Sequence, residues 1–140
     1  MRAQVYKPLG LRWSMRVLCL CSEGANRSRV CANYLSSLGY ETRYRGAREG
    51  ARNPLKDGDI KWADVIICTR PKHARMLMER FEVRKPIIIL DISDVPKEIR
   101  ESLSEENVRL VEEKILLPQI KKQISQWLPL EEYVKKWKEK

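Results

Sequence analysis

One stretch of the sequence combines a cysteine, several small residues and an arginine at a spacing that suits phosphate chemistry. The stretch consists of Cys21, Ser22, Glu23, Gly24, Ala25, Asn26, Arg27 and Ser28. A cysteine thiolate is a strong nucleophile, and the planar guanidinium of arginine can bind two oxygens of one phosphoryl group. The hydroxyl of Ser28 could donate a hydrogen bond to the same sulfur. We therefore predict a loop, residues 22–28, that holds a phosphate dianion over the thiolate of Cys21.

The segments on either side of this loop are the ones that such chemistry needs. An apolar run at residues 17–20 predicts a buried strand, and apolar residues at helical spacing predict a helix that begins near Ser28 and ends at Gly39. A loop between a parallel strand and a helix directs backbone N–H groups and the helix dipole at one point. Ligands of doubly wound sheets bind beyond the carboxyl ends of the strands. The sequence thus places Cys21 where an anion would bind.

Two aspartates, Asp91 and Asp94, follow a later apolar run at residues 86–90. A parallel strand there would end at the same edge of the sheet as the strand before Cys21. The leaving oxygen of a phosphoryl transfer needs a proton, and a general acid that supplies it contributes on the order of 10²–10⁴ in rate. We predict that at least one of the two aspartates has this role. The alternative is that they cap the following helix.

Strands and helices alternate along most of the chain, which predicts an α/β domain with helices on both faces of a parallel sheet. The predicted fold is a three-layer α-β-α arrangement with a four-stranded parallel sheet and extra C-terminal helices. The predicted strands are residues 16–20, 41–45, 63–68 and 86–90. Pro71 should begin a helix that ends near Arg80. Its buried side should carry Ala74, Leu77, Met78 and Phe81.

The chain divides into three predicted regions. They are an N-terminal extension at residues 1–14, a domain at residues 15–128 that contains the loop, and a C-terminal basic amphipathic helix at residues 129–140. Trp13 of the extension is expected to pack on the domain. A capped helix should start at Ser104, and Pro118 either kinks that helix or begins another one.

The motif Cys21-x5-Arg27-Ser28 after an apolar strand resembles the low-molecular-weight protein tyrosine phosphatase superfamily, and in particular a small prokaryotic branch of predicted phosphatases. Further segments carry the resemblance, which covers about residues 15–100: residues 52–55, 62–66, 72–73 and 85–94. The resemblance implies that Cys21 is the nucleophile, that Arg27 binds phosphate and the transition state, and that Ser28 stabilises the thiolate. It implies Asp94 as the general acid, with Asp91 as the second choice.

Two positions depart from the pattern of the superfamily. Many members have a second cysteine directly before the arginine, where this chain has Asn26, and most have an aromatic residue beside the acid aspartate. Here the neighbours of that aspartate are Ile92, Ser93 and Val95. The resemblance still implies phosphotyrosine in proteins as the leading substrate. At these two positions the chain lacks the aromatic residue that would form a wall of a phosphotyrosine slot and the cysteine that could protect the nucleophile as a disulfide.

Composition and charge indicate which partners, cellular location and cofactors to expect. The 140 residues carry a formal net charge of +9, which favours anionic partners. We expect a phosphorylated protein or a small phosphomonoester; nucleic-acid binding rests on charge alone and is not expected. No run approaches the roughly 20 apolar residues that span a bilayer, and no secretory signal is visible, so a cytoplasmic location without membrane contact is expected. Four cysteines and one histidine at these spacings fit no metal site, and no cofactor is expected.

Other functions and milder interpretations stay open at this point. Thiol-dependent arsenate reduction needs further cysteines, and none follows Cys68. A domain that only binds phosphate or a phosphoprotein would share the loop, although phosphate-relay domains with a similar loop normally lack the arginine. Cys19, Cys31 and Cys68 are expected to be core residues, with Cys31 or Cys68 as a resolving thiol for oxidised Cys21 the alternative. His73 is expected to be a solvated surface residue, with a minor role near the rim of the site as the alternative. The sequence does not indicate an oligomeric state.

Overall fold

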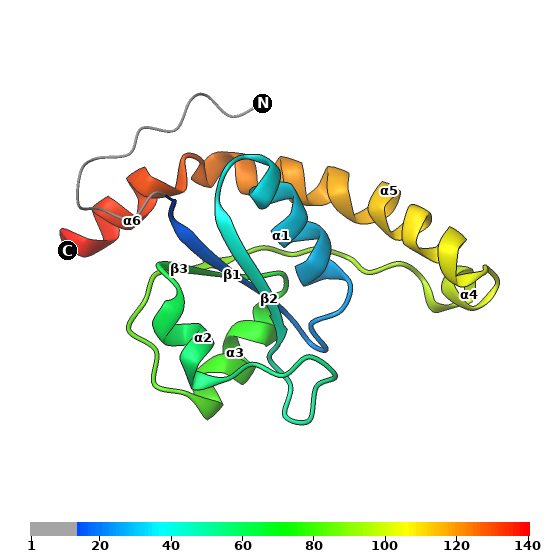
Figure 1. The fold of residues 1–140 in the computed structure, drawn as a ribbon, viewed down its shortest axis with the longest axis horizontal. Coiled ribbons are helices and arrows are strands. Elements are labelled where there is room, and N and C mark those ends of the chain that lie inside the picture. The colour runs from blue at the N-terminus through cyan, green and yellow to red at the C-terminus, as the bar shows by residue number, and fades with distance from the viewer. Residues whose placement is uncertain (1–13) are drawn as a thin grey trace.

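The computed structural model describes residues 14–140, and Trp13 with the rest of the predicted extension lies outside this range. Its centre is a four-stranded, all-parallel sheet in the order β2-β1-β3-β4 (Figure 1). The strands are β1 (Arg16–Cys21), β2 (Glu41–Gly46), β3 (Val65–Cys68) and β4 (Ile87–Ile89). The predicted α/β fold class and all four strands are confirmed. The architecture agrees with the fold that the resemblance implied.

Strand β1 lies between β2 and β3 and carries the core on both of its faces. Val17 and Cys19 belong to the apolar cluster on one face, and Leu18 and Leu20 to the cluster on the other. All four side chains are completely buried. Successive residues of a strand point to opposite faces, so a strand covered on both sides needs a continuous apolar run. This is why residues 17–20 could be recognised from the sequence.

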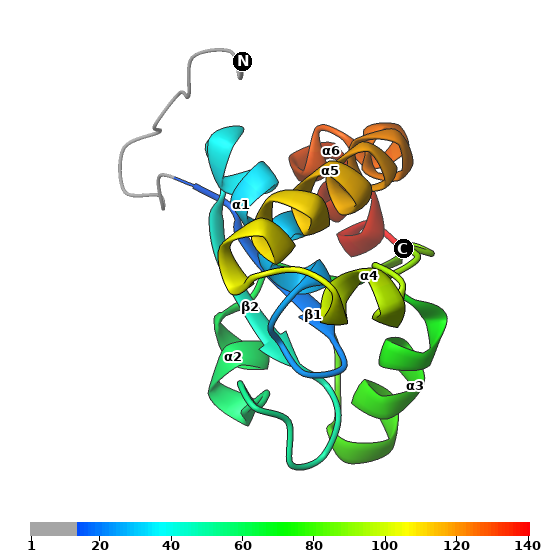
Figure 2. The ribbon, with the colours of Figure 1, turned by 90° about the vertical axis from the view of Figure 1, so that its right-hand side faces the viewer.

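Helices cover both faces of the sheet, which gives the predicted three layers (Figures 1 and 2). One face is covered by α1 (Arg27–Ser37), α5 (Glu105–Ile124) and α6 (Leu130–Lys138), and the other by α2 (Asp57–Trp62) and α3 (Pro71–Arg80). A short helix, α4 (Lys97–Glu101), precedes α5, and a single 3₁₀ turn, η1 (Ser125–Trp127), follows it. The C-terminal α6 buries Leu130 and Val134 in the same core as α1 and β1.

Two helices settle details that the sequence left open or misplaced. Helix α5 continues through Pro118, so of the two expectations for this proline the start of another helix is wrong, and a kink within the helix stays a prediction. In α3 the buried residues are His73 and Leu77, which are one turn apart. Met78 was predicted to point inward, but its side chain is 57% exposed, because it is rotated about 100° from Leu77 around the helix axis.

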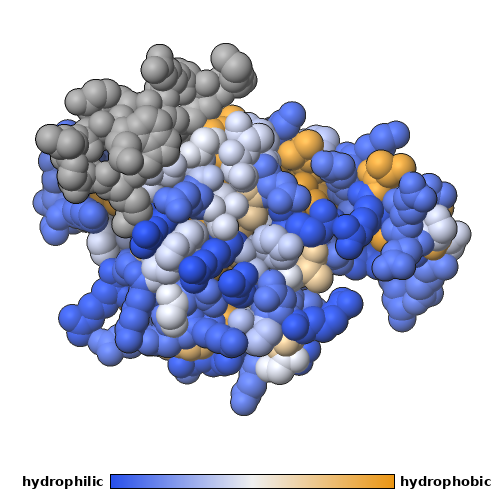
Figure 3. Space-filling view, in the orientation of Figure 1, coloured by the Kyte–Doolittle hydropathy of each residue, from blue (hydrophilic) through white to orange (hydrophobic). Residues whose placement is uncertain are grey.

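Polar side chains dominate the face of the molecule that Figure 3 shows. Apolar residues form only small separate patches on this face. Within the part of the chain that the structure describes, no helix combines the length and the apolar character needed to cross a membrane.

Candidate active site

Cys21 is the last residue of β1, and its side chain is 3% exposed. Its sulfur lies 3.0 Å from the hydroxyl oxygen of the fully buried Ser28. The backbone N–H of Gly24 donates a second hydrogen bond to the same sulfur, at 3.2 Å. Hydrogen bonds to the charged form of a group favour that form, so both contacts stabilise a thiolate. The structure brings Cys21 and Ser28 together as the motif predicts.

The carbonyl groups of the loop are all bound by donors on its outer side. Cys21, Ser22 and Glu23 accept from backbone N–H groups of the segment after β2, at 2.8–3.1 Å. Gly24 accepts from Asn53, Ala25 from Arg29, and Asn26 from Val30. In a trans peptide the N–H points opposite to the C=O, so the amides of this loop point toward its interior. Apart from the Gly24 amide, none of those between residues 22 and 26 has a hydrogen-bond acceptor within residues 14–140. The loop therefore presents a set of donors to an anion.

Gly24 is the position where the loop tolerates no side chain. Its φ of +74° lies in the left-handed region, and an added Cβ would lie 2.6 Å from the Arg45 carbonyl carbon and 2.8 Å from the Asn53 carbonyl oxygen. The phosphate loop is thus in direct contact with the end of β2 and the segment that follows it.

An ion pair and a hydrogen bond also connect the segment after β2 to the phosphate loop. Glu23 forms an ion pair with Arg48, with 3.0 Å between Oε1 and Nη2, and also accepts the backbone N–H of Arg52 at 3.2 Å. The hydrogen bond from Arg48 lowers the pKa of the Glu23 carboxyl, although both side chains are partly exposed. Glu23, which also lines the catalytic cavity, therefore connects the loop to the segment after β2.

Arg27 is the first residue of α1 and is 8% exposed. One guanidinium nitrogen, Nη1, donates to the carbonyl oxygen of Ile92 at 3.3 Å. This bond links the phosphate loop to the segment after β4, which is itself held by the N–H of Ile92 donating to Thr69. The other guanidinium N–H groups have no partner within the described residues, so they remain available to phosphoryl oxygens.

The structure separates the two candidate acids. A cavity of about 170 Å³ contains Cys21, Arg27 and Asp94 in its lining, together with Arg52 and Arg100. One Asp94 oxygen, Oδ1, accepts from the N–H of Val95 at 2.8 Å and from Arg100 at 2.7 Å. Its Oδ2 has no hydrogen-bond partner among residues 14–140.

Asp91 does not line the cavity. Its carboxylate is 71% exposed and forms an ion pair with Arg70 at 2.8 Å. Helix α4 begins at Lys97 after Pro96, so neither aspartate occupies its N-cap position. The geometry favours Asp94 over Asp91 as the acid.

His73 is completely buried, so the prediction that it is a solvated surface residue is wrong. Its Nδ1 accepts the backbone N–H of Arg70 at 3.0 Å and contacts the Thr69 hydroxyl, which donates to Leu20. The proton of the neutral ring must therefore be on Nε2, which donates to the Ser22 hydroxyl at 3.2 Å. A buried position is possible for this polar side chain because both ring nitrogens have partners, the Arg70 N–H at the start of α3 and the Ser22 hydroxyl in the loop.

The environment of His73 keeps it uncharged. Burial lowers the pKa of its imidazole to about 3, with a further contribution from the positive charges of Arg27, Lys72 and Arg70. The ring is neutral at physiological pH and acts on the phosphate loop through Ser22.

The three other cysteines lie in the core, as predicted, and all four are free thiols. The hydrogen bond with Cys31, together with burial, raises the pKa of Cys19 far above its usual value. Burial raises the pKa of Cys68 to about 12. The thiols of Cys19 and Cys68 are therefore protonated, and both are shielded from solvent. Within residues 14–140, no three Cys, His, Asp or Glu side chains group in a way that could hold a metal ion.

Sequence reasoning missed several residues that the structure brings to the site. Arg52 and Arg100 line the cavity but belong to no motif with Cys21. His73 contacts Ser22, which lies 51 positions earlier in the sequence. Arg52 and His73 belonged to segments that carried the resemblance, residues 52–55 and 72–73, and this was the only signal for the group.

No protein-family model matches this sequence, and no curated protein matches it significantly. Among solved structures, the chain is similar to the YwlE arginine phosphatase from Geobacillus stearothermophilus. The comparison gives a TM-score of 0.46 and 20% sequence identity, and it covers 81% of this chain and 96% of the other. Similarity at this level does not show a shared activity. The function has to be inferred from the geometry of the site.

Proposed function

We propose that this protein is a cysteine-dependent phosphatase that hydrolyses phosphomonoesters through a phosphocysteine intermediate. The observation that carries the proposal is the environment of the Cys21 sulfur. This buried sulfur receives two hydrogen bonds and lies below a loop of amide donors, in the same cavity as an arginine and a carboxyl group. A structural cysteine would need none of these neighbours, as the surroundings of Cys19 and Cys68 show.

In the first step the Cys21 thiolate attacks phosphorus, and the bond between phosphorus and the ester oxygen breaks. The loop amides and the guanidinium of Arg27 bind the three non-bridging oxygens, where charge is concentrated in the transition state. The leaving oxygen takes a proton from Asp94, for which Oδ2 is the oxygen without another partner. An alcohol or phenol leaves, and the phosphoryl group is bound to sulfur.

In the second step a water molecule attacks the phosphocysteine. Asp94, now a carboxylate, accepts a proton from this water, the bond between sulfur and phosphorus breaks, and inorganic phosphate leaves. The hydrogen bonds from Ser28 and Gly24 stabilise the thiolate that is regenerated. The cycle needs neither a metal nor an organic cofactor.

We propose phosphotyrosine in proteins as the leading substrate, on the strength of the resemblance described above. Among residues 14–140, no aromatic side chain lines the catalytic cavity; its lining includes Arg52 and Arg100 instead. Arsenate reduction is disfavoured because Cys19, Cys31 and Cys68 are all buried, and no exposed thiol is present to relay electrons.

Hydrolysis of an aryl phosphate in excess chelator tests the proposal. We expect turnover by the wild type, competitive inhibition by vanadate, and no turnover by Cys21→Ser. The matched control is Cys31→Ala, which also removes one buried thiol but not the nucleophile, and should keep its activity. Turnover by Cys21→Ser would exclude the mechanism. Tight binding of phosphate or vanadate without any turnover by the wild type would favour a binding domain.

A further inference from the structure

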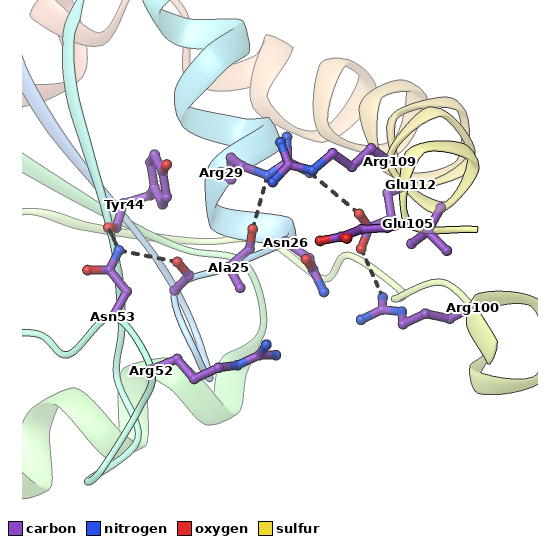
Figure 4. Close-up of a pocket in the computed structure, with 12 residues that line it drawn as sticks. Ala25, Asn26, Arg29, Tyr44, Arg52, Asn53, Arg100, Glu105, Arg109 and Glu112 are labelled. Carbon is purple, nitrogen blue, oxygen red and sulfur yellow. Dashed lines mark hydrogen bonds and ion pairs between the residues drawn. The ribbon is translucent and has the colours of Figure 1, made fainter. Parts of the chain in front are cut away.

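A second, larger cavity adjoins the catalytic one. Its volume is about 530 Å³, and it shares Ala25, Asn26, Arg52 and Arg100 with the lining of the catalytic cavity. Figure 4 shows it between the phosphate loop, the segment that follows β2, and the first turns of α5. A substrate whose phosphoryl group lies above Cys21 would therefore extend into this second cavity past the two shared arginines.

The charges of this cavity are unevenly paired. Its lining contains four arginines and two glutamates, which gives a net charge of +2. Glu112 is 3% exposed and is neutralised by Arg29 at 3.5 Å and Arg100 at 3.4 Å. These three side chains form one ion-pair network, whose contacts are drawn as dashed lines in Figure 4.

Arg52 and Arg109 are the cations of this lining without such a partner. Both are exposed, and within residues 14–140 neither guanidinium forms a hydrogen bond or an ion pair. The backbone of Arg52 is anchored to the phosphate loop through Glu23, so its side chain starts from a fixed point next to the catalytic cavity. Two guanidinium groups in the lining of one cavity offer hydrogen-bond donors and positive charge to a carboxylate or a phosphoryl group.

We propose that this cavity binds a second anionic group of the substrate, and that the preferred substrates are phosphopeptide segments with an acidic or second phosphorylated side chain near the phosphorylated residue. The proposal rests on the proposed phosphatase function and names the substrate class of the same site. A continuous polyphosphate backbone fits less well, because it would bring many negative charges close to Glu105, which belongs to the same lining.

Paired phosphotyrosine peptides test the proposal. Each pair differs only by Glu or Ala at one position within three residues of the phosphotyrosine, and the readout is the ratio of kcat/KM for the two peptides. One charge-assisted contact predicts a wild-type ratio of about three to ten at the best position. Arg52→Gln and Arg109→Gln should each lower this ratio toward one. The control Arg75→Gln removes the same charge from an exposed position of α3 that lines neither cavity, and should leave the ratio unchanged.

A binding measurement separates this proposal from the phosphatase function. The affinity of Cys21→Ser for the same peptides, followed by fluorescence anisotropy, should show the same preference for the acidic member and the same loss when Arg109→Gln is added. If the acidic peptide binds more tightly but the wild type shows no turnover, the proposed phosphatase function is wrong and the proposed anion subsite still holds. Equal values for Glu and Ala peptides at every position, or a preference that both arginine variants keep, would overturn the subsite even if the enzyme is active.

Discussion

The protonation of His73 gives a prediction that does not depend on the substrate. His73 is the only histidine of the chain, it is completely buried, and burial lowers the pKa of its imidazole to about 3. In the unfolded chain its pKa should be near the ordinary value of about 6.5. Below pH 6.5 the unfolded state therefore binds a proton that the folded state does not. The free energy of unfolding must decrease as the pH falls through this window.

The size of the effect follows from the two pKa values. Between pH 7.5 and pH 5.5 the proton taken up by the unfolded state should lower the free energy of unfolding by about 1.4 kcal/mol. Ordinary carboxyl groups have pKa values near 4 and contribute little in this range. A folded-state pKa of about 3 means that the loss continues down to that pH, where His73 is protonated in the native protein as well.

Urea unfolding followed by the fluorescence of the four tryptophans would measure this slope. His73→Gln keeps an N–H donor for Ser22 but cannot titrate, so its free energy of unfolding should be lower at pH 7.5 and nearly constant down to pH 5.5. The single imidazole C2 proton signal in an NMR titration should keep its neutral position throughout this range. A histidine signal that titrates near pH 6.5 in the folded protein, or an equal slope in His73→Gln, would refute the buried hydrogen-bonded arrangement.

Three further predictions concern the loop and the acid. Asp94→Asn should lower kcat for an alkyl phosphate by on the order of 10²–10⁴, whereas Asp91→Asn should have little effect; the opposite order would move the acid role to Asp91. Ser28→Ala removes a hydrogen bond to the thiolate and should lower kcat/KM for an aryl phosphate by about 10- to 100-fold, and an unchanged value would show that the contact is not catalytic. Gly24→Ala should lower the free energy of unfolding by about 2 kcal/mol or more, measured in urea, since its Cβ would collide with the end of β2.

The sequence predicted the parts of this protein that are encoded locally. A continuous apolar run, a turn-rich segment and a helical pattern around Cys21 were enough to predict a loop at the end of a buried strand. Pro71 correctly predicted the start of α3, and Gly39 predicted the end of α1 to within two residues. The strand order β2-β1-β3-β4 was not predicted, because the rules for chain connections limit the arrangements of a parallel sheet without selecting one.

The residues that the sequence did not predict reach the site through tertiary contacts. Arg52 and Arg100 have no spacing relation to Cys21, and their positions depend on how the segments after β2 and β4 fold over the loop. His73 was assigned to the surface because a lone polar residue early in a helix is usually solvated. It is buried because its ring accepts from the nearby Arg70 N–H and donates to Ser22; the contact with Ser22, 51 positions away, could not be predicted from neighbouring residues.

Trapping of the covalent intermediate tests catalysis by Cys21 most directly. The enzyme would be mixed with an aryl phosphate, quenched in denaturant within the first turnovers and digested with trypsin, and the peptide of residues 17–27 sequenced by mass spectrometry. The mechanism predicts one added phosphoryl group on Cys21 and none on Cys19, with more label in Asp94→Asn if hydrolysis of the intermediate is slowed. Turnover without phosphorylated Cys21, or label on another residue, would contradict it.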